Sequence, residues 1–147
     1  MFKNILVPTD GSKLSNRAVG RALALAKQHK AKIVGVHVFS SEPRGSQGEY
    51  APAYALIRQR MRELGREQAK KILDRVEAKA KSAGVKFERA VEENDRAWEG
   101  IVGAARKKHC DLIAMAAHGR GTVSAFLLGS ETSGVLSHSK IPVIVYR

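Results

Sequence analysis

Five short apolar runs alternate with segments of helical periodicity, and this alternation restricts the fold more than any other feature of the chain. The runs cover Ile5–Val7, Ile33–Phe39, Val85–Val91, Leu112–Ala116 and Pro142–Tyr146. The second is dense in Val and Ile, and in the third apolar and charged residues alternate. Strands that alternate with helices predict parallel pairing through right-handed crossovers. We therefore predict an α/β fold with a doubly wound, five-stranded parallel sheet and helices on both faces.

Four helices are predicted between these strands. Ser12 is a suitable N-cap for a first helix whose apolar residues recur from Leu14 to Ala26. A long second helix covers about Ala53–Ala83, a third follows Asp95, and a short fourth spans Ser130–His138. The candidate buried residues of the long helix are Leu56, Met61, Leu64, Ile72, Leu73, Val76 and Ala80.

Length and composition predict one compact domain over residues 1–147. The chain is 44% hydrophobic and holds one cysteine, Cys110, which excludes a disulfide within the chain and a cysteine-based metal site. Met1–Asn4 leads directly into a strand, which leaves no room for a signal peptide, and no apolar run approaches membrane-spanning length. We expect a cytoplasmic protein that does not contact a membrane.

The chain is strongly basic, with 26 Lys and Arg against 14 Asp and Glu and a net charge of +12. Such a charge attracts nucleic acid and nucleotides. Much of it lies in Arg58–Lys81, where acids are interspersed and Glu67 precedes Lys71 by one helical turn. A solvated helix face is therefore favoured, and nucleic acid is ranked last among the possible partners because net charge alone supports it.

Two loops follow the first and fourth strands, which we expect to be neighbours at the centre of the sheet. Ligands of such sheets bind beyond the carboxyl ends of the strands, where the strand order reverses. The first loop is Pro8–Ser12; the second runs from Ala116 to Gly129 and ends at the helix start Ser130. Glycines and a helix N-terminus together suit phosphate. The ordinary alternatives are a turn with a helix cap in the first loop and a plain N-cap junction in the second.

The same residues resemble the universal stress protein (UspA-like) family over essentially the whole chain. The resemblance is carried by residues 5–12, by Val36-His37-Val38, by the stretch from Met115 to Ser130 and by residues 141–145. It implies a Rossmann-like fold of the adenine nucleotide-binding type. Nucleotide-binding members carry glycine, two residues, glycine, nine residues, then glycine and Ser/Thr. Gly119 and Gly129-Ser130 fit this spacing, whereas Ala116 replaces the first glycine.

The resemblance also implies a set of site residues. Asp10 would hydrogen-bond the nucleoside, and the main chain of Val38 would meet the adenine edge. The wall beside Asp10 would be shaped by Pro8 and Thr9, the phosphate donors would be Gly119, Gly129, Ser130 and Thr132, and Arg120 would add a cation.

Two positions put this site in question. If the family glycine requires a positive φ, Ala116 costs about 1 kcal/mol or somewhat more. Glu131 suits the helix dipole of the empty protein, but its carboxylate would repel phosphate if it pointed inward.

We therefore predict a stress-response protein that binds an adenine nucleotide, foremost ATP with or without Mg²⁺, and that is not an enzyme. No Walker-type, nucleophile-elbow or zincin motif occurs in the chain. Asp10 is the one obvious carboxylate at the loop, so no dedicated metal site follows. The alternative is a nucleotide-free interaction module of the same family. In both cases we expect a homodimer through the apolar C-terminal strand, because an apolar edge strand invites pairing.

Overall fold

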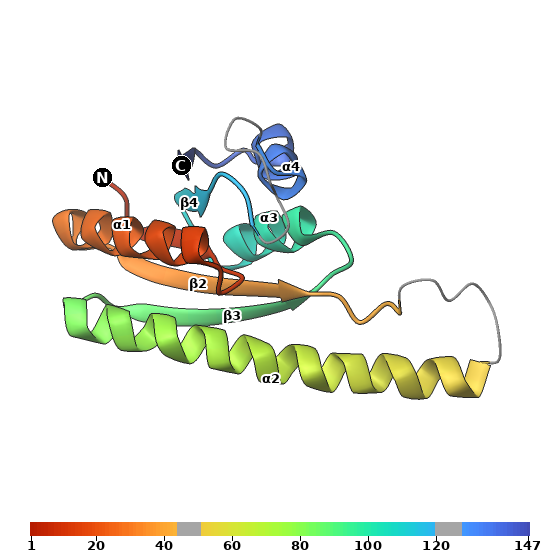
Figure 1. The fold of residues 1–147 in the computed structure, drawn as a ribbon. Helices are drawn as coiled ribbons and strands as arrows, with labels where there is room; N and C mark the ends of the chain where they lie inside the picture. Colours follow the sequence, from red (N-terminus) through yellow and green to blue (C-terminus); the bar gives the residue numbers. More distant parts are fainter. Residues whose placement is uncertain (44–50, 120–127) are drawn as a thin grey trace.

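The computed structural model describes residues 1–43, 51–119 and 128–147 (Figure 1). Strands and helices alternate along this part of the chain, as predicted. The elements are β1 (Asn4–Pro8), α1 (Lys13–His29), β2 (Lys32–Phe39), α2 (Ala51–Ala83), β3 (Phe87–Glu93), α3 (Ala97–Lys107), β4 (Leu112–Ala116), α4 (Ser130–His138) and β5 (Val143–Tyr146).

The five described strands form one parallel sheet in the order β3-β2-β1-β4-β5. β1 therefore lies at the centre, with β2 on one side and β4 on the other. The strand order reverses at β1, which confirms the predicted fold and the predicted pairing of the first and fourth strands. Because all strands run the same way, every helix begins at the edge of the sheet where the strands end.

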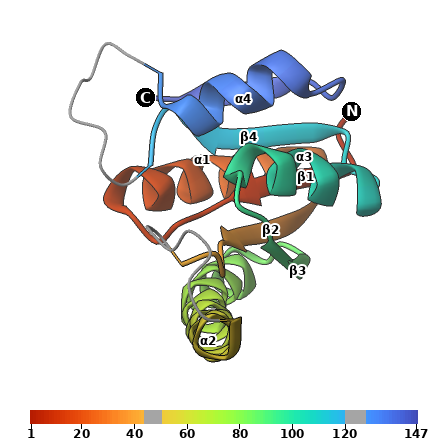
Figure 2. The same cartoon turned by 90° about the vertical axis from the view of Figure 1, so that its right-hand side faces the viewer.

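Helices α1 and α2 cover one face of the sheet, and α3 and α4 cover the other (Figures 1 and 2). Ile5 and Val7 of β1 pack with α1 and α2, whereas Leu6 packs with α3 and α4. This alternation follows from the period of two in a strand, and both of its phases are apolar because both faces are covered. Helix–strand packing thus fixes the central strands, and with them the loops at their ends.

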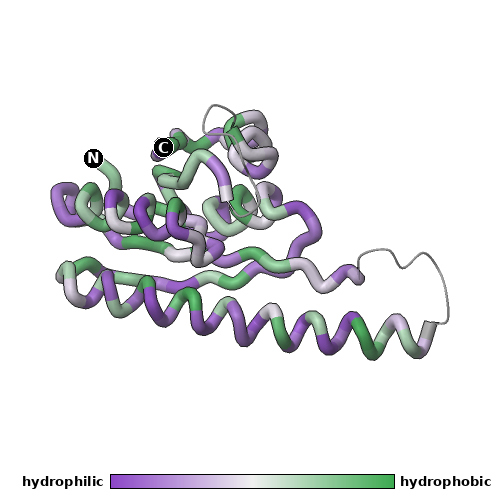
Figure 3. Tube along the Cα trace, viewed as in Figure 1, coloured by the Kyte–Doolittle hydropathy of each residue, from purple (hydrophilic) through white to green (hydrophobic). Residues whose placement is uncertain are grey.

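The first half of α2 extends past the sheet (Figure 1), so part of the predicted core is wrong. Leu56 is 68% exposed and Leu64 is 46% exposed, although the four predicted positions from Ile72 to Ala80 are buried. The helix passes the end of β2 at Gly65, where an added Cβ would lie 2.2 Å from the Phe39 ring. Before this point the apolar residues of α2, green in Figure 3, have no strand beneath them.

Cys110 is buried beside β4. Burial raises the pKa of its thiol to about 11, so the thiolate is scarce at neutral pH. Among the described helices, none combines the length and the apolar character that crossing a membrane requires.

Candidate functional site

The loop after β1 is a tight turn built by its own side chains. The Asp10 carboxylate accepts a hydrogen bond from the main-chain N–H of Ser12 over 2.9 Å. Gly11 between them has φ 77°, in the left-handed region that favours glycine. Ser12 in turn accepts from the N–H of Ser15 over 3.2 Å, as the predicted cap of α1. The turn therefore places the Asp10 carboxylate at the first turn of a helix.

Thr9 anchors this loop to the sheet. Its N–H donates to the Val36 carbonyl over 2.9 Å, and His37 Nδ1 donates to its carbonyl over 2.8 Å. Its hydroxyl accepts from the Ser15 hydroxyl over 2.6 Å, and the residue is 5% exposed. His37 is thus a hydrogen-bonded core histidine, as its place in an apolar strand indicates. Thr9 supports the wall of the site from within the protein.

Val38 presents its main chain to the space beyond the end of β1. The register pairs Pro8 with Val36, and the Val36 carbonyl already accepts from Thr9. Because main-chain groups alternate along a strand, the N–H and C=O of Val38 point to the same side as those of Val36. The Val38 side chain packs on α3, where a Cβ at Gly100 would lie 2.7 Å from it.

The loop after β4 meets the loop after β1. A Cβ added to Gly119 would lie 2.6 Å from Asp10 Oδ2, a separation that real Cβ atoms do not show. Across the same loop, a Cβ at Gly129 would lie 3.2 Å from the Cα of His118. A Cβ at 119 would displace the Asp10 carboxylate from this position, and the two predicted loops are neighbours. Arg120, the predicted extra cation, lies outside the described residues.

Two of the predicted phosphate donors are engaged within the protein. The Gly129 N–H donates to the Ala117 carbonyl over 2.9 Å. The Thr132 hydroxyl donates to the Ala116 carbonyl over 3.1 Å, and Thr132 is 2% exposed. The predicted donation from these two groups is therefore not available in this structure. The first-turn amides of α4, beginning at Ser130, have no acceptor within their own helix and remain suited to an anion.

Ala116 and Glu131 fit the structure without the conflicts that the sequence suggested. Lys30 and His109 are the described non-glycine residues with positive φ, so Ala116 is not strained. Glu131 Oε2 accepts from the N–H of Trp98 over 2.6 Å, at the first turn of α3. The carboxylate is turned toward α3. Glu131 and Trp98 are 33 residues apart in the sequence, and no local sequence pattern predicts this contact.

Two surface hollows lie away from these loops. One, of about 360 Å³, lies between α2 and the ends of β2 and β3; a second, of about 490 Å³, lies along α2 itself. We place the candidate site at Asp10, Gly119 and Gly129 and not at these hollows, because the contacts of these residues join the loops that follow β1 and β4. Within the described ranges, no group of three or more His, Cys, Asp and Glu side chains is arranged to hold a metal ion.

The whole chain is similar to one family of known proteins. The model of the universal stress protein family matches residues 1–147. This chain belongs to the universal stress protein family. It is 36% identical over 147 residues to a universal stress protein of Thermus aquaticus, and the match covers 100% of both chains. It is 34% identical over 148 residues to the universal stress protein MJ0531 of Methanocaldococcus jannaschii, covering 100% of this chain and 83% of the relative.

Solved structures share the fold of this universal stress protein. The protein MJ0577 superimposes with a TM-score of 0.83 at 25% identity, covering 99% of this chain and 95% of the other. A universal stress protein in complex with cAMP gives 0.71 at 26% identity, with 99% and 97% covered. The Archaeoglobus fulgidus universal stress protein in complex with dAMP gives 0.67 at 17% identity, with 99% and 98% covered, which shows the fold alone.

Proposed function

We propose that this universal stress protein binds an adenine nucleotide, foremost ATP, between the loops that follow β1 and β4. The observation that carries the proposal is the approach of Gly119 to Asp10, which leaves no room for a Cβ. Glycine at such a contact lets the main chain come close to a ligand held by the neighbouring loop. The cAMP complex of a relative at 26% identity supports the same ligand class.

The proposed roles follow from the positions of the groups. Asp10 accepts from the nucleoside, and the main chain of Val38 meets the adenine edge over the end of β1. Pro8 and Thr9 form the wall between them. The first-turn amides of α4 at Ser130 and Glu131 face the phosphates, because a helix N-terminus offers unpaired N–H groups and partial positive charge.

Mg²⁺ fits this site as a companion of the phosphates. Magnesium in nucleotide sites takes one or two carboxylates and several phosphate and water oxygens. Asp10 can supply a carboxylate oxygen there. The ion would neutralise phosphate charge, while the described residues hold and orient the nucleotide. We further propose a cytoplasmic, stress-responsive role without steady ATP turnover.

Calorimetric titration with ATP, AMP and cAMP, each with and without Mg²⁺, tests the proposal. We expect saturable binding of ATP and at least a tenfold loss of affinity in Asp10→Ala, because a charge-assisted hydrogen bond contributes about 1.5–3 kcal/mol. Ser133→Ala, at an exposed position of α4, is the matched control and should bind as the natural protein does. Absence of saturable binding at millimolar nucleotide contradicts the proposal.

A second candidate is a nucleotide-free dimeric interaction module. The engaged Gly129 N–H and Thr132 hydroxyl favour it, since they remove two donors from the phosphate side. In that case the apolar strand β5 and the basic surface would carry the function. Sedimentation that shows a stable dimer, combined with a flat calorimetric titration, supports this candidate over the first.

A further inference from the structure

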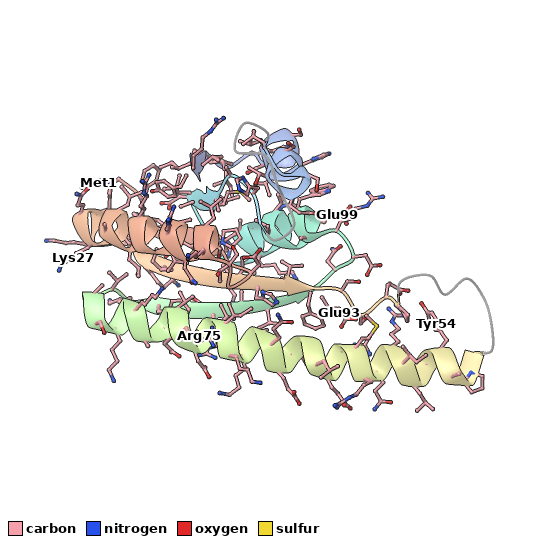
Figure 4. All side chains as sticks on the ribbon, viewed as in Figure 1. Met1, Lys27, Tyr54, Arg75, Glu93 and Glu99 are labelled. Atoms are coloured by element: carbon pink, nitrogen blue, oxygen red, sulfur yellow. The ribbon has the colours of Figure 1, made fainter. Side chains whose placement is uncertain are left out.

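The solvent face of α1 is basic and contains no acid. Residues 11–41 hold six Lys and Arg and no Asp or Glu. On α1 the exposed cations are Lys13, Arg17, Arg21 and Lys27, with exposed Gly20 and Ala24 among them. We call these six residues the basic face of α1; Figure 4 shows Lys27 pointing outward from the helix.

The cations of this face have no acidic partner within the described part of the chain, whereas several cations of α2 have one. On α2, Arg62 pairs with Glu93 over 2.8 Å and Lys70 pairs with Asp74 over 2.7 Å. Arg21 lies 5.5 Å from the centroid of the Tyr146 ring, an interaction that leaves its charge uncompensated. The face therefore presents four positive charges with no acid among them.

Several residues of this face destabilise the helix that carries them. Lys13 is the first residue of α1, the first turn holds no acid, and a cation there opposes the helix dipole. Lys13, Arg17 and Arg21 follow one another at four-residue spacing, where like charges repel. Gly20 weakens the helix further, although a Cβ there would meet nothing within 4 Å. Features that break local rules without a compensating contact are typical of functional surfaces.

We propose that the basic face of α1 binds the phosphate backbone of double-stranded nucleic acid without reading its sequence. The four-residue spacing sets successive cations about 6 Å apart, so three of them span about 12 Å, over which a duplex passes about seven phosphate charges. Two of the three are arginines, whose guanidinium fork suits phosphate. The small residues Gly20 and Ala24 let a broad rod approach closely.

Duplex is favoured over single strands because the exposed face of α1 carries no aromatic side chain on which bases could stack. Lys and Arg side chains suit phosphate oxygens, so we assign the contacts of this face to the backbone. Net charge alone did not favour nucleic acid. The row of unpaired cations on α1, which lowers the stability of the helix, is the additional observation that favours nucleic acid. This proposal does not depend on nucleotide binding.

Fluorescence anisotropy of a labelled duplex of about two helical turns, over a series of KCl concentrations, tests this proposal. The variant Lys13→Gln/Arg17→Gln/Arg21→Gln removes three charges from the face. Lys79→Gln/Arg106→Gln/Lys140→Gln is the matched control, because it removes three exposed charges outside α1 that form no ion pair with a described residue. We expect the α1 variant to make the salt slope less negative by about 2.7 and to lower low-salt affinity at least tenfold. The control should retain most of both.

Thermal unfolding separates lost binding from lost folding. The α1 variant should be at least as stable as the natural chain, because it removes repulsion within the helix. No duplex binding at low salt, or equal losses in the two variants, overturns the proposal. Displacement by polyglutamate of equal charge is a further test. If polyglutamate displaces the labelled duplex as effectively as unlabelled duplex does, the proposal is overturned, because an acidic polypeptide then fits this face equally well.

Discussion

At the scale of single residues, Gly119 gives the most specific prediction. In Gly119→Ala the new Cβ would lie 2.6 Å from Asp10 Oδ2, so the Asp10 carboxylate or one of the two loops must shift. We expect at least a tenfold loss of ATP affinity in calorimetry, with little change in unfolding temperature because both loops are at the surface. Gly103→Ala is the control, since a Cβ there meets nothing within 4 Å. An unchanged affinity in Gly119→Ala contradicts the proposed site.

The ion pairs of Glu88 make the free energy of unfolding depend on pH. The Lys108 ammonium, followed by that of Lys32, lowers the pKa of the Glu88 carboxyl from 4.5 to about 2. Between these values the unfolded chain binds more protons, so stability present above pH 4.5 is lost as the pH falls toward 2. Urea unfolding of Glu88→Gln should therefore show a shallower acid decline than that of the natural chain. Glu67→Gln, exposed and without an ion pair among the described residues, should keep the natural profile.

At the scale of elements, Glu131 joins the first turns of α3 and α4. Its carboxylate caps α3, whose own N-cap residue, Arg96, makes no side-chain cap bond. Glu131→Ala should destabilise the fold by about 1 kcal/mol, because it removes a cap bond and a favourable charge at a helix N-terminus. Urea unfolding measures this loss, and Ser133→Ala in the same helix is the control. If the two variants are equally stable, the cap contributes nothing.

The position of an element can be predicted from the sequence when one continuous segment carries the whole pattern of that element. The apolar runs of β1 and β4, and the loops at their ends, could be placed because each forms a continuous segment. Leu56 and Leu64 could not be placed, because helical spacing does not tell where the strands beneath α2 stop. The Glu131–Trp98 bond could not be predicted, because its partners are distant in sequence and meet through the packing of two helices.

At the scale of the whole molecule, the two edges of the sheet differ in charge. On the edge strand β3, Arg89 pairs with Asp74 and Glu77, and Glu88, Glu92 and Glu93 each pair with a Lys or Arg. Charged side chains of this kind discourage further pairing at an edge. The opposite edge, β5, consists of Val143–Tyr146 and carries no charge. The structure therefore discourages association at one edge and leaves the other suited to it.

Self-association through β5 is predicted on this basis. The carbonyls of Pro142 and Tyr146 bond to β4, so by alternation the N–H of Val145 points away from the sheet. Val145→Pro removes that outward N–H without removing a bond to β4, as proline tolerates on an edge strand. In sedimentation equilibrium the natural chain should weigh twice the 16.0 kDa of one chain, and Val145→Pro should shift toward 16.0 kDa. Val145→Thr keeps the N–H and should remain dimeric; a monomeric natural chain at high concentration contradicts the predicted interface.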